Sequence, residues 1–171
     1  EKSFTDLQED VTYLLASVTR PSIFKKLSTE KCFVFDTSES DKFREMRYKN
    51  GYRIVTVINA GGSVTITSLS LSMNLGFNEF HIFGLDLLLD DPDYTHAKGI
   101  AGNSVEPLPL GIEINGINLL TTTSFLDFAN QTLDLVSAGH ENGLLKSIKF
   151  YGDSLINYMW DGQWHDETET Q

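Results

Sequence analysis

The sequence predicts an α/β fold, and two observations carry that prediction. Short apolar runs rich in aromatic and β-branched residues recur along the chain, and most of them are separated by stretches that suit helices. An Asn115-Gly116 pair between two alternating apolar arms indicates a type I′ β-hairpin. We therefore expect a Rossmann-like layered sheet, mostly parallel, with helices on both faces and one β-hairpin.

Composition and charge exclude several classes of protein. Thirteen basic residues stand against 24 acidic ones, for a net charge of -11. Such a surface repels phosphate backbones and anionic lipid heads, so we expect neither nucleic acid nor a membrane surface as a partner. No apolar run approaches the roughly 18 residues that a membrane span needs. We expect one domain over residues 1–171, with an acidic tail at 161–171.

The opening residues and the single cysteine indicate the compartment. The first ten residues, EKSFTDLQED, are polar and acidic, which argues against a signal peptide. Cys32 is the only cysteine, so neither an internal disulfide nor a cysteine zinc cage is expected. It stands in the apolar run CFVF and is interpreted as a buried small hydrophobe. A cytoplasmic protein fits this pattern best.

The expected elements alternate along the chain. Proline at position 21 suits a first helical turn, Asn50-Gly51 suits a helix end, and Asp153 is expected to cap the last helix. The expected strands are 13–17, 32–36, 53–58, 80–84 and 147–152. The expected helices are 22–27, 40–49, 64–75, one that starts at Thr123 or Ser124 with Asp127 in a capping-box spacing, and 154–160.

For one of these expected helices, the sequence pattern also favours a strand. Residues 64–75, VTITSLSLSMNL, alternate apolar and polar side chains, which favours a strand, although they also leave a helical face. A parallel crossover between the flanking strands requires a helix of about a dozen residues. We therefore expect a helix here, ended by Gly76.

Candidate site residues follow the strands, where ligands bind in open α/β sheets. The segment Asn59–Ser63, NAGGS, has two glycines that let backbone approach a ligand, and amides at a helix start that favour phosphate. A plain tight turn with Ser63 as helix cap is the alternative. Asp86, in Gly84-Leu85-Asp86, could hold a ribose, a metal or a substrate hydroxyl, or act as a general base; alternatively it caps a turn.

A long connection after Asp86 supplies further candidates. His96 could be a general base, a phosphate partner or neither, and the nearby carboxylates would favour its protonated form. The aspartates at 90, 91 and 93 could bind Mg²⁺ together with ligand phosphates, or form a solvated acidic loop. Asn103 is a candidate ligand contact. The chain has no zinc-binding histidine spacing and no Gly-x-Ser-x-Gly motif.

Three stretches together resemble the MptE-like family of Rossmann-like domains. They are LLASVTRPSIFKKL, the segment GGSVTITSLSLSMNLGFNEFHIFGLDLLLDD with THAKG after it, and INLLTTTSFLDFA with the later IKFYGDSLINYM. The family includes archaeal 6-hydroxymethylpterin diphosphokinases and bacterial motility accessory factors linked to flagellin glycosylation. Its layout is similar to that of bacterial sialyltransferases that use CMP-sugars. The resemblance runs from about Leu14 to Met159.

The resemblance implies a nucleotide-dependent transferase. Gly61, Gly62 and Ser63 would line the nucleotide or phosphate site, and Asp86 and His96 would face the substrate. A glycosyltransferase with a nucleotide-sugar donor is favoured, and a Mg²⁺-dependent diphosphokinase is the alternative. Family members commonly open with another strand, a Gly-rich turn and a Pro-Asp segment, which have no counterpart before Tyr13. That departure keeps open a non-catalytic binding or assembly module, and a homo-oligomer is allowed.

Overall fold

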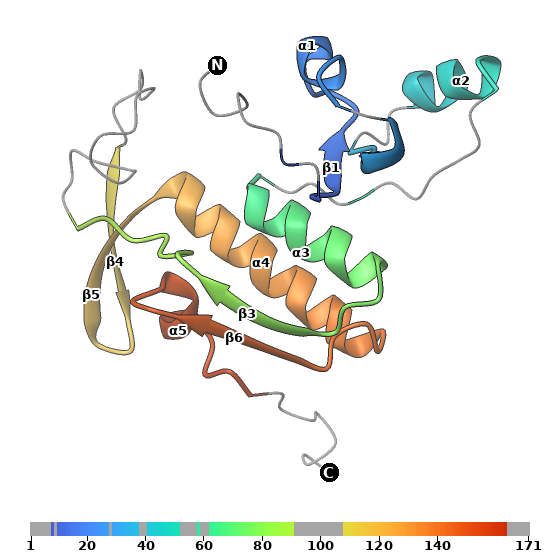
Figure 1. Ribbon diagram of the computed structural model, residues 1–171. Helices are drawn as coiled ribbons and strands as arrows, with labels where there is room; N and C mark the ends of the chain where they lie inside the picture. Colours follow the sequence, from blue (N-terminus) through green and yellow to red (C-terminus); the bar gives the residue numbers. More distant parts are fainter. Residues whose placement is uncertain are drawn as a thin grey trace. The chain divides into compact units, whose positions relative to one another are not determined.

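The computed structural model describes residues 8, 10–27, 29–37, 41–51, 58, 62–90 and 108–163. The chain divides into two compact units, residues 1–60 and residues 61–171, and each is described here by itself. Both units combine helices with pairs of parallel strands, so the fold is α/β (Figure 1). The expectation of a single domain remains a prediction.

The first unit contains a parallel strand pair. Strand β1 (Tyr13–Ala16) pairs with β2 (Cys32–Phe35) in parallel register. After β2, the N–H of Ile58 donates to the carbonyl oxygen of Asp36 at 2.9 Å, so Ile58 lies beside the end of β2. The rest of the expected strand at 53–58 lies outside the described residues.

Three short helical elements accompany this pair, and two details differ from expectation. They are α1 (Pro21–Phe24), the 3₁₀ helix η2 (Thr29–Lys31) and α2 (Asp41–Lys49). Helix α1 begins at its proline but ends three residues earlier than expected. None of its residues is buried, so no tertiary packing stabilises a longer helix. Cys32 is half-buried, so its interpretation as a fully buried residue is wrong.

The second unit is built on β3 (Glu79–Phe83) and β6 (Ser147–Tyr151), which pair in parallel. Helices α3 (Val64–Asn74) and α4 (Thr123–Glu141) lie side by side along these strands (Figure 1). Between helices and strands lies an apolar core that excludes water and supplies the main stabilising free energy. Its most buried members, at most 4% exposed, are Leu69, Met73, Ala129, Val136, Leu145, Leu155 and Ile156.

Residues 64–74 form a helix, as the topology requires and against their alternation. Ser63 caps it, because its Oγ accepts from the N–H of Ile66 at 3.3 Å. The buried positions Ile66, Leu69, Ser70 and Met73 follow helical spacing on the side that faces the core. Gly76 ends the turn with φ 94°, a conformation that favours glycine.

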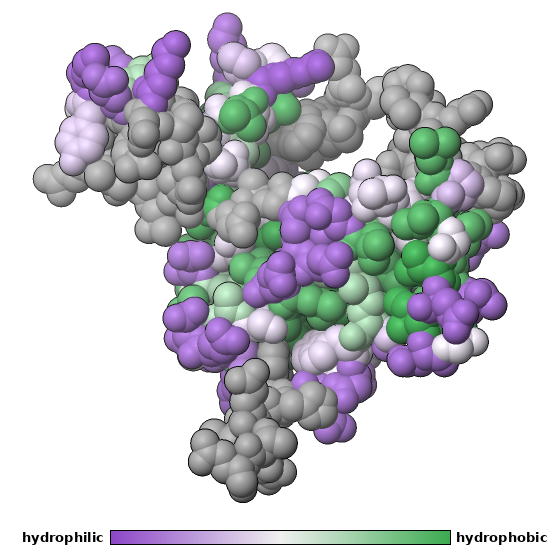
Figure 2. All heavy atoms as spheres, turned by 180° about the vertical axis from the view of Figure 1, so that it is seen from behind, coloured by the Kyte–Doolittle hydropathy of each residue, from purple (hydrophilic) through white to green (hydrophobic). Residues whose placement is uncertain are grey.

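The hairpin is formed as predicted. Strand β4 (Pro109–Ile114) pairs antiparallel with β5 (Ile117–Thr122). Asn115 and Gly116 have φ of 53° and 78°, the two positive values that a type I′ turn requires. Figure 2 shows hydrophobic side chains (green) gathered over this hairpin among polar ones (purple).

Two helix caps differ from expectation by one or two positions. Helix α4 begins at Thr123, but its cap is Thr122, whose hydroxyl accepts from the N–H of Phe125 at 3.1 Å. Asp127 is five residues after this cap rather than three, so it does not form a capping box. Helix α5 (Leu155–Met159) is capped by Ser154 rather than by Asp153. In both cases the hydroxyl of the residue directly before the helix reaches the free amides of the first turn.

The segment after β3 is held by later parts of the chain. Leu85, Leu87 and Leu89 point into the core while the residues between them face outward or are half-buried. The hydroxyl of Thr121 donates to the carbonyl oxygen of Leu87 at 2.7 Å, and the N–H of Leu89 donates to Leu120 at 2.8 Å. Strand β5 thus fixes this segment from the side. Within the described ranges, no helix is long and apolar enough to cross a membrane.

Substitution of Thr121 by valine is expected to lower the free energy of unfolding by about 1–3 kcal/mol, because a buried carbonyl loses its donor. The matched control is Thr123→Val, the same change at an exposed position, which should stay within about 0.5 kcal/mol of the parent. Urea denaturation measures both. Equal stability of the two variants would show that the Thr121 bond does not hold this segment.

Candidate functional site

The candidate site lies where β3 and β6 end. Strand β3 continues into Gly84, with φ 72°, and then into Asp86, whose side chain is exposed. Strand β6 continues into Gly152, with φ 93°. A Cβ atom added to Gly152 would stand 3.8 Å from Oδ1 of Asp86, so the carboxylate lies directly against the second loop. The expected position of Asp86 at the carboxyl edge of the strands is confirmed.

Buried hydrogen bonds join the two loops beneath this carboxylate. The Ser154 hydroxyl donates to the carbonyl oxygen of Leu85 at 2.5 Å, and the N–H of Leu155 donates to the carbonyl oxygen of Asp86 at 2.7 Å. Ser154 and Leu155 are at most 1% exposed. The backbone of Asp86 is therefore fixed, which is the preorganisation that a catalytic or binding carboxylate needs.

Leu87, directly after Asp86, has an unusual backbone conformation. Its φ is 57°, in the left-handed region that bulky side chains rarely adopt. Burial of its side chain and the hydrogen bond from Thr121 stabilise this conformation. Residues held in such conformations cluster at functional sites, so this feature supports the choice of this edge.

A second carboxylate belongs to the same edge. Asp153 follows Gly152, and its Oδ1 accepts from the Tyr158 hydroxyl at 2.7 Å. This hydrogen bond, with smaller contributions from desolvation and from the charge of Asp153, raises the pKa of Tyr158 above its ordinary value. Asp153 thus carries an exposed negative charge beside the loop against which Asp86 lies.

Side chains of α4 engage Gly62 just before the start of α3. The N–H of Gly62 donates to Oε1 of Gln131 at 3.0 Å, and Nε2 of Gln131 donates to Asp127 at 2.6 Å. A Cβ atom at Gly62 would stand 2.0 Å from the Phe128 ring. The glycine therefore allows α4 to approach the start of α3. With Ser63 as the cap of α3, these features match the tight-turn alternative.

The other predicted site residues divide between those that the structure describes and those outside the described ranges. The described residues bring Asp86 and Gly84 together with Gly152 and Asp153 at one edge. Asp90 is exposed and follows the segment that β5 holds. The predicted site residues that lie outside the described ranges are Asn59, Gly61, Asp91, Asp93, His96 and Asn103.

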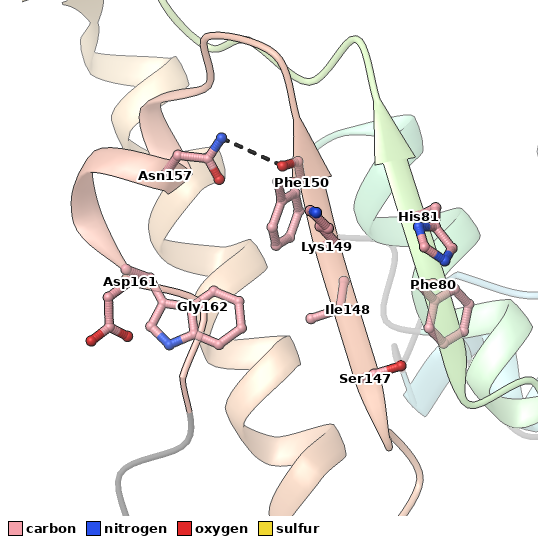
Figure 3. A pocket seen from close by; sticks show the side chains of 10 residues that line it. Phe80, His81, Ser147, Ile148, Lys149, Phe150, Asn157, Asp161 and Gly162 are labelled. Atoms are coloured by element: carbon pink, nitrogen blue, oxygen red, sulfur yellow. Dashed lines mark hydrogen bonds between the residues drawn. The ribbon is translucent and has the colours of Figure 1, made fainter.

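One cavity was not anticipated from the sequence. It has a volume of about 610 Å³ and extends along the middle of β3 and β6 to the end of α5 (Figure 3). Its lining includes His81, Lys149 and Trp160, and none of the predicted site residues. Alternation along two strands places His81 and Lys149 on one face, but only the parallel register sets them opposite each other.

Among the described residues, no group of three or more His, Cys, Asp or Glu side chains could hold a metal ion. Magnesium needs fewer protein ligands, because it commonly binds one or two carboxylates together with substrate phosphates. Asp86 and Asp153 would supply ligands of that type.

Comparison of the chain with family models, curated proteins and solved structures gave no match. The resemblance to the MptE-like family therefore remains a prediction that depends on the sequence motifs alone.

Gly62→Ala is expected to lower the free energy of unfolding by about 1–3 kcal/mol, because the new methyl group overlaps the Phe128 ring. Gly111→Ala is the control, since no atom lies within 4 Å of its added Cβ and its φ is not positive. A double variant, Gly62→Ala with Phe128→Leu, should recover part of the loss. An unaltered Gly62→Ala protein would contradict the packing role of this glycine.

Asp153→Asn is expected to lower the pKa of Tyr158 toward its ordinary value of 10.0. The folded pKa is raised, so the hydrogen bond stabilises the fold fully below the unfolded pKa and is lost as pH rises through the folded value. Ultraviolet titration of phenolate, with Tyr158→Phe to assign the signal, measures this. Asp134→Asn is the control, and identical titrations of all carboxylate variants would refute the interaction.

Proposed function

We propose that the chain is a nucleotide-dependent transferase with Rossmann-like layering, and that it transfers a sugar from a nucleotide-sugar donor. The observation that carries the proposal is the position of Asp86. Its exposed carboxylate stands on a fixed backbone at the carboxyl ends of two parallel strands, next to Gly152. Ligands of open α/β sheets bind at this edge.

In this proposal Asp86 acts as the general base. It takes the proton from an acceptor hydroxyl, whose oxygen attacks the anomeric carbon of the donor sugar. The bond from that carbon to the phosphate oxygen breaks, and the nucleotide leaves with the electron pair. His96 is proposed to offset the negative charge that develops on the departing phosphate.

The contacts of Gly62 limit where the phosphates can bind. Its N–H is already donated to Gln131, so this amide is not available to a ligand. The proposal therefore keeps Asn59, Gly61 and Asn103, which lie outside the described residues, as the sequence-based candidates for the donor phosphates. Gly84 stays among the proposed ligand-binding residues, and its φ of 72° is a conformation that favours glycine.

Two other functions have specific support. Asp86 and Asp153 could position Mg²⁺ on ATP, as a diphosphokinase of the 6-hydroxymethylpterin type requires. The bond from Gly62 to Gln131 instead favours a non-catalytic binding or assembly module, because it closes an amide that a nucleotide site would use.

A nucleotide panel separates the three functions. Thermal unfolding is measured with CMP, CDP, UDP, ATP and GTP, each with and without Mg²⁺. At a hundredfold excess over Kd the proposed donor nucleotide should raise Tm by about 5–10 °C. Stabilisation by a cytidine or uridine nucleotide without metal supports glycosyl transfer. Stabilisation by ATP only with Mg²⁺ supports the kinase, and no shift with any nucleotide supports the binding module.

Asp86→Asn tests the assigned residue. The variant should keep the Tm of the parent without ligand, because none of the hydrogen bonds that fix its loop uses the Asp86 side chain. It should lose transferase activity by at least about 100-fold, the usual scale for a general base. Asp134→Asn, an exposed carboxylate on α4, is the charge-matched control. Retained activity in Asp86→Asn would remove Asp86 from the mechanism.

A further inference from the structure

We propose that the 610 Å³ cavity beside β6 binds a small planar organic anion. The cavity lies along β6 and the end of α5, and its lining takes Phe80, Ile148 and Phe150 from the core-facing side of the strands and His81, Ser147 and Lys149 from the other side (Figure 3). Phe80, Ile82 and Ile148 pack against the core. The alternate residues, among them His81 and Lys149, therefore project away from it. Parallel strands are usually covered on both faces, so the face that carries His81 and Lys149 is a natural place for a ligand.

The cavity lining holds one lysine, Lys149, and one aspartate, Asp161, in a part of the chain that is strongly acidic. Residues 61–171 contain fifteen acidic residues but three basic ones, Lys98, Lys146 and Lys149. Two of these three lie on or next to β6. Lys146 is paired with Glu79 at 2.8 Å, whereas Lys149 makes no ion pair within the described ranges. Its Nζ lies 5.0 Å from the centre of the Tyr151 ring. Lys149 is thus the positive charge that the cavity can offer to an anion.

Hydrogen-bond donors surround this charge. Ser147 lines the cavity with its hydroxyl. Nδ1 of His81 lies 2.7 Å from the Tyr151 hydroxyl. When that hydroxyl donates to Nδ1, the Nε2 atom of His81 carries the hydrogen and can donate to an anion. The imidazole also stacks on Tyr151, with ring centres 5.6 Å apart, which orients it.

An aromatic side chain supplies part of the cavity wall. Trp160 lines the cavity, and its indole is held by an N–H bond to the carbonyl oxygen of Gln163 at 3.0 Å and by an edge-on contact with Phe150. The nearby carboxylate of Asp161 accepts the N–H of Gln163 at 2.9 Å, so one of its oxygens is already engaged. A ligand that contacts both residues needs an aromatic ring for Trp160 and an acidic group for Lys149. The volume suits such a molecule.

The test uses three probes that separate the ring from the charge. Naphthalene-1-sulfonate has both, methanesulfonate has the acid alone, and 1-naphthylmethylammonium has the ring with the opposite charge. The chain contains two tryptophans, so a Trp164→Phe background leaves Trp160 as the single indole. Its indole N–H resonance in a nitrogen-15 NMR titration reports binding at the cavity. Naphthalene-1-sulfonate should shift it saturably, with an affinity at least about tenfold above those of the other two probes.

Charge variants locate the anion. Lys149→Gln should lower the affinity for naphthalene-1-sulfonate by about fivefold, which is the effect of losing one unpaired surface charge in contact with the ligand. Lys25→Gln, an exposed lysine of the first unit, should leave it unchanged. An unmoved indole resonance, equal binding of the cationic or ring-free probe, or equal effects of the two lysine variants would each overturn the proposal. The cavity shares no residue with the proposed transferase site, so Asp86→Asn should not alter this binding.

Discussion

The architecture of the second unit depends on how the chain is held after it leaves β3. Three leucines there enter the core on alternate positions, and the polar backbone between them must find partners inside the protein. Those partners come from β5 and from the start of α5, more than thirty residues later in the sequence. The hairpin, the last helix and the parallel strands are therefore joined through one extended segment rather than through side-chain packing alone.

This arrangement explains why the candidate site lies at the carboxyl edge. The same hydrogen bonds that satisfy the buried carbonyls of Leu85 and Leu87 set the direction of the side chain between them. Asp86 is exposed as a consequence of burying its neighbours. The left-handed backbone conformation of Leu87 costs conformational free energy, and burial of the Leu87 side chain offsets that cost.

Local chemistry made much of the fold predictable, and non-local contacts account for what was missed. The turn at Asn115-Gly116 and the end of α3 at Gly76 follow from backbone preferences that a single residue carries. The helix at 64–74 required a topological argument, because its own alternation favours a strand. The packing of Phe128 on Gly62 and the cavity beside Trp160 depend on residues about 66 and 80 positions apart, which no local pattern reveals.

The uneven charge of residues 61–171 has a consequence for the kinetics of any anionic ligand. This part of the sequence has fifteen acidic residues and three basic ones, so its net negative charge repels an approaching phosphate or sulfonate before it reaches a contact. Dissolved salt shortens the range of that repulsion to about 8 Å at physiological ionic strength. Encounter should therefore quicken as salt is added, which is the reverse of the dependence typical of basic proteins that capture anions by long-range attraction.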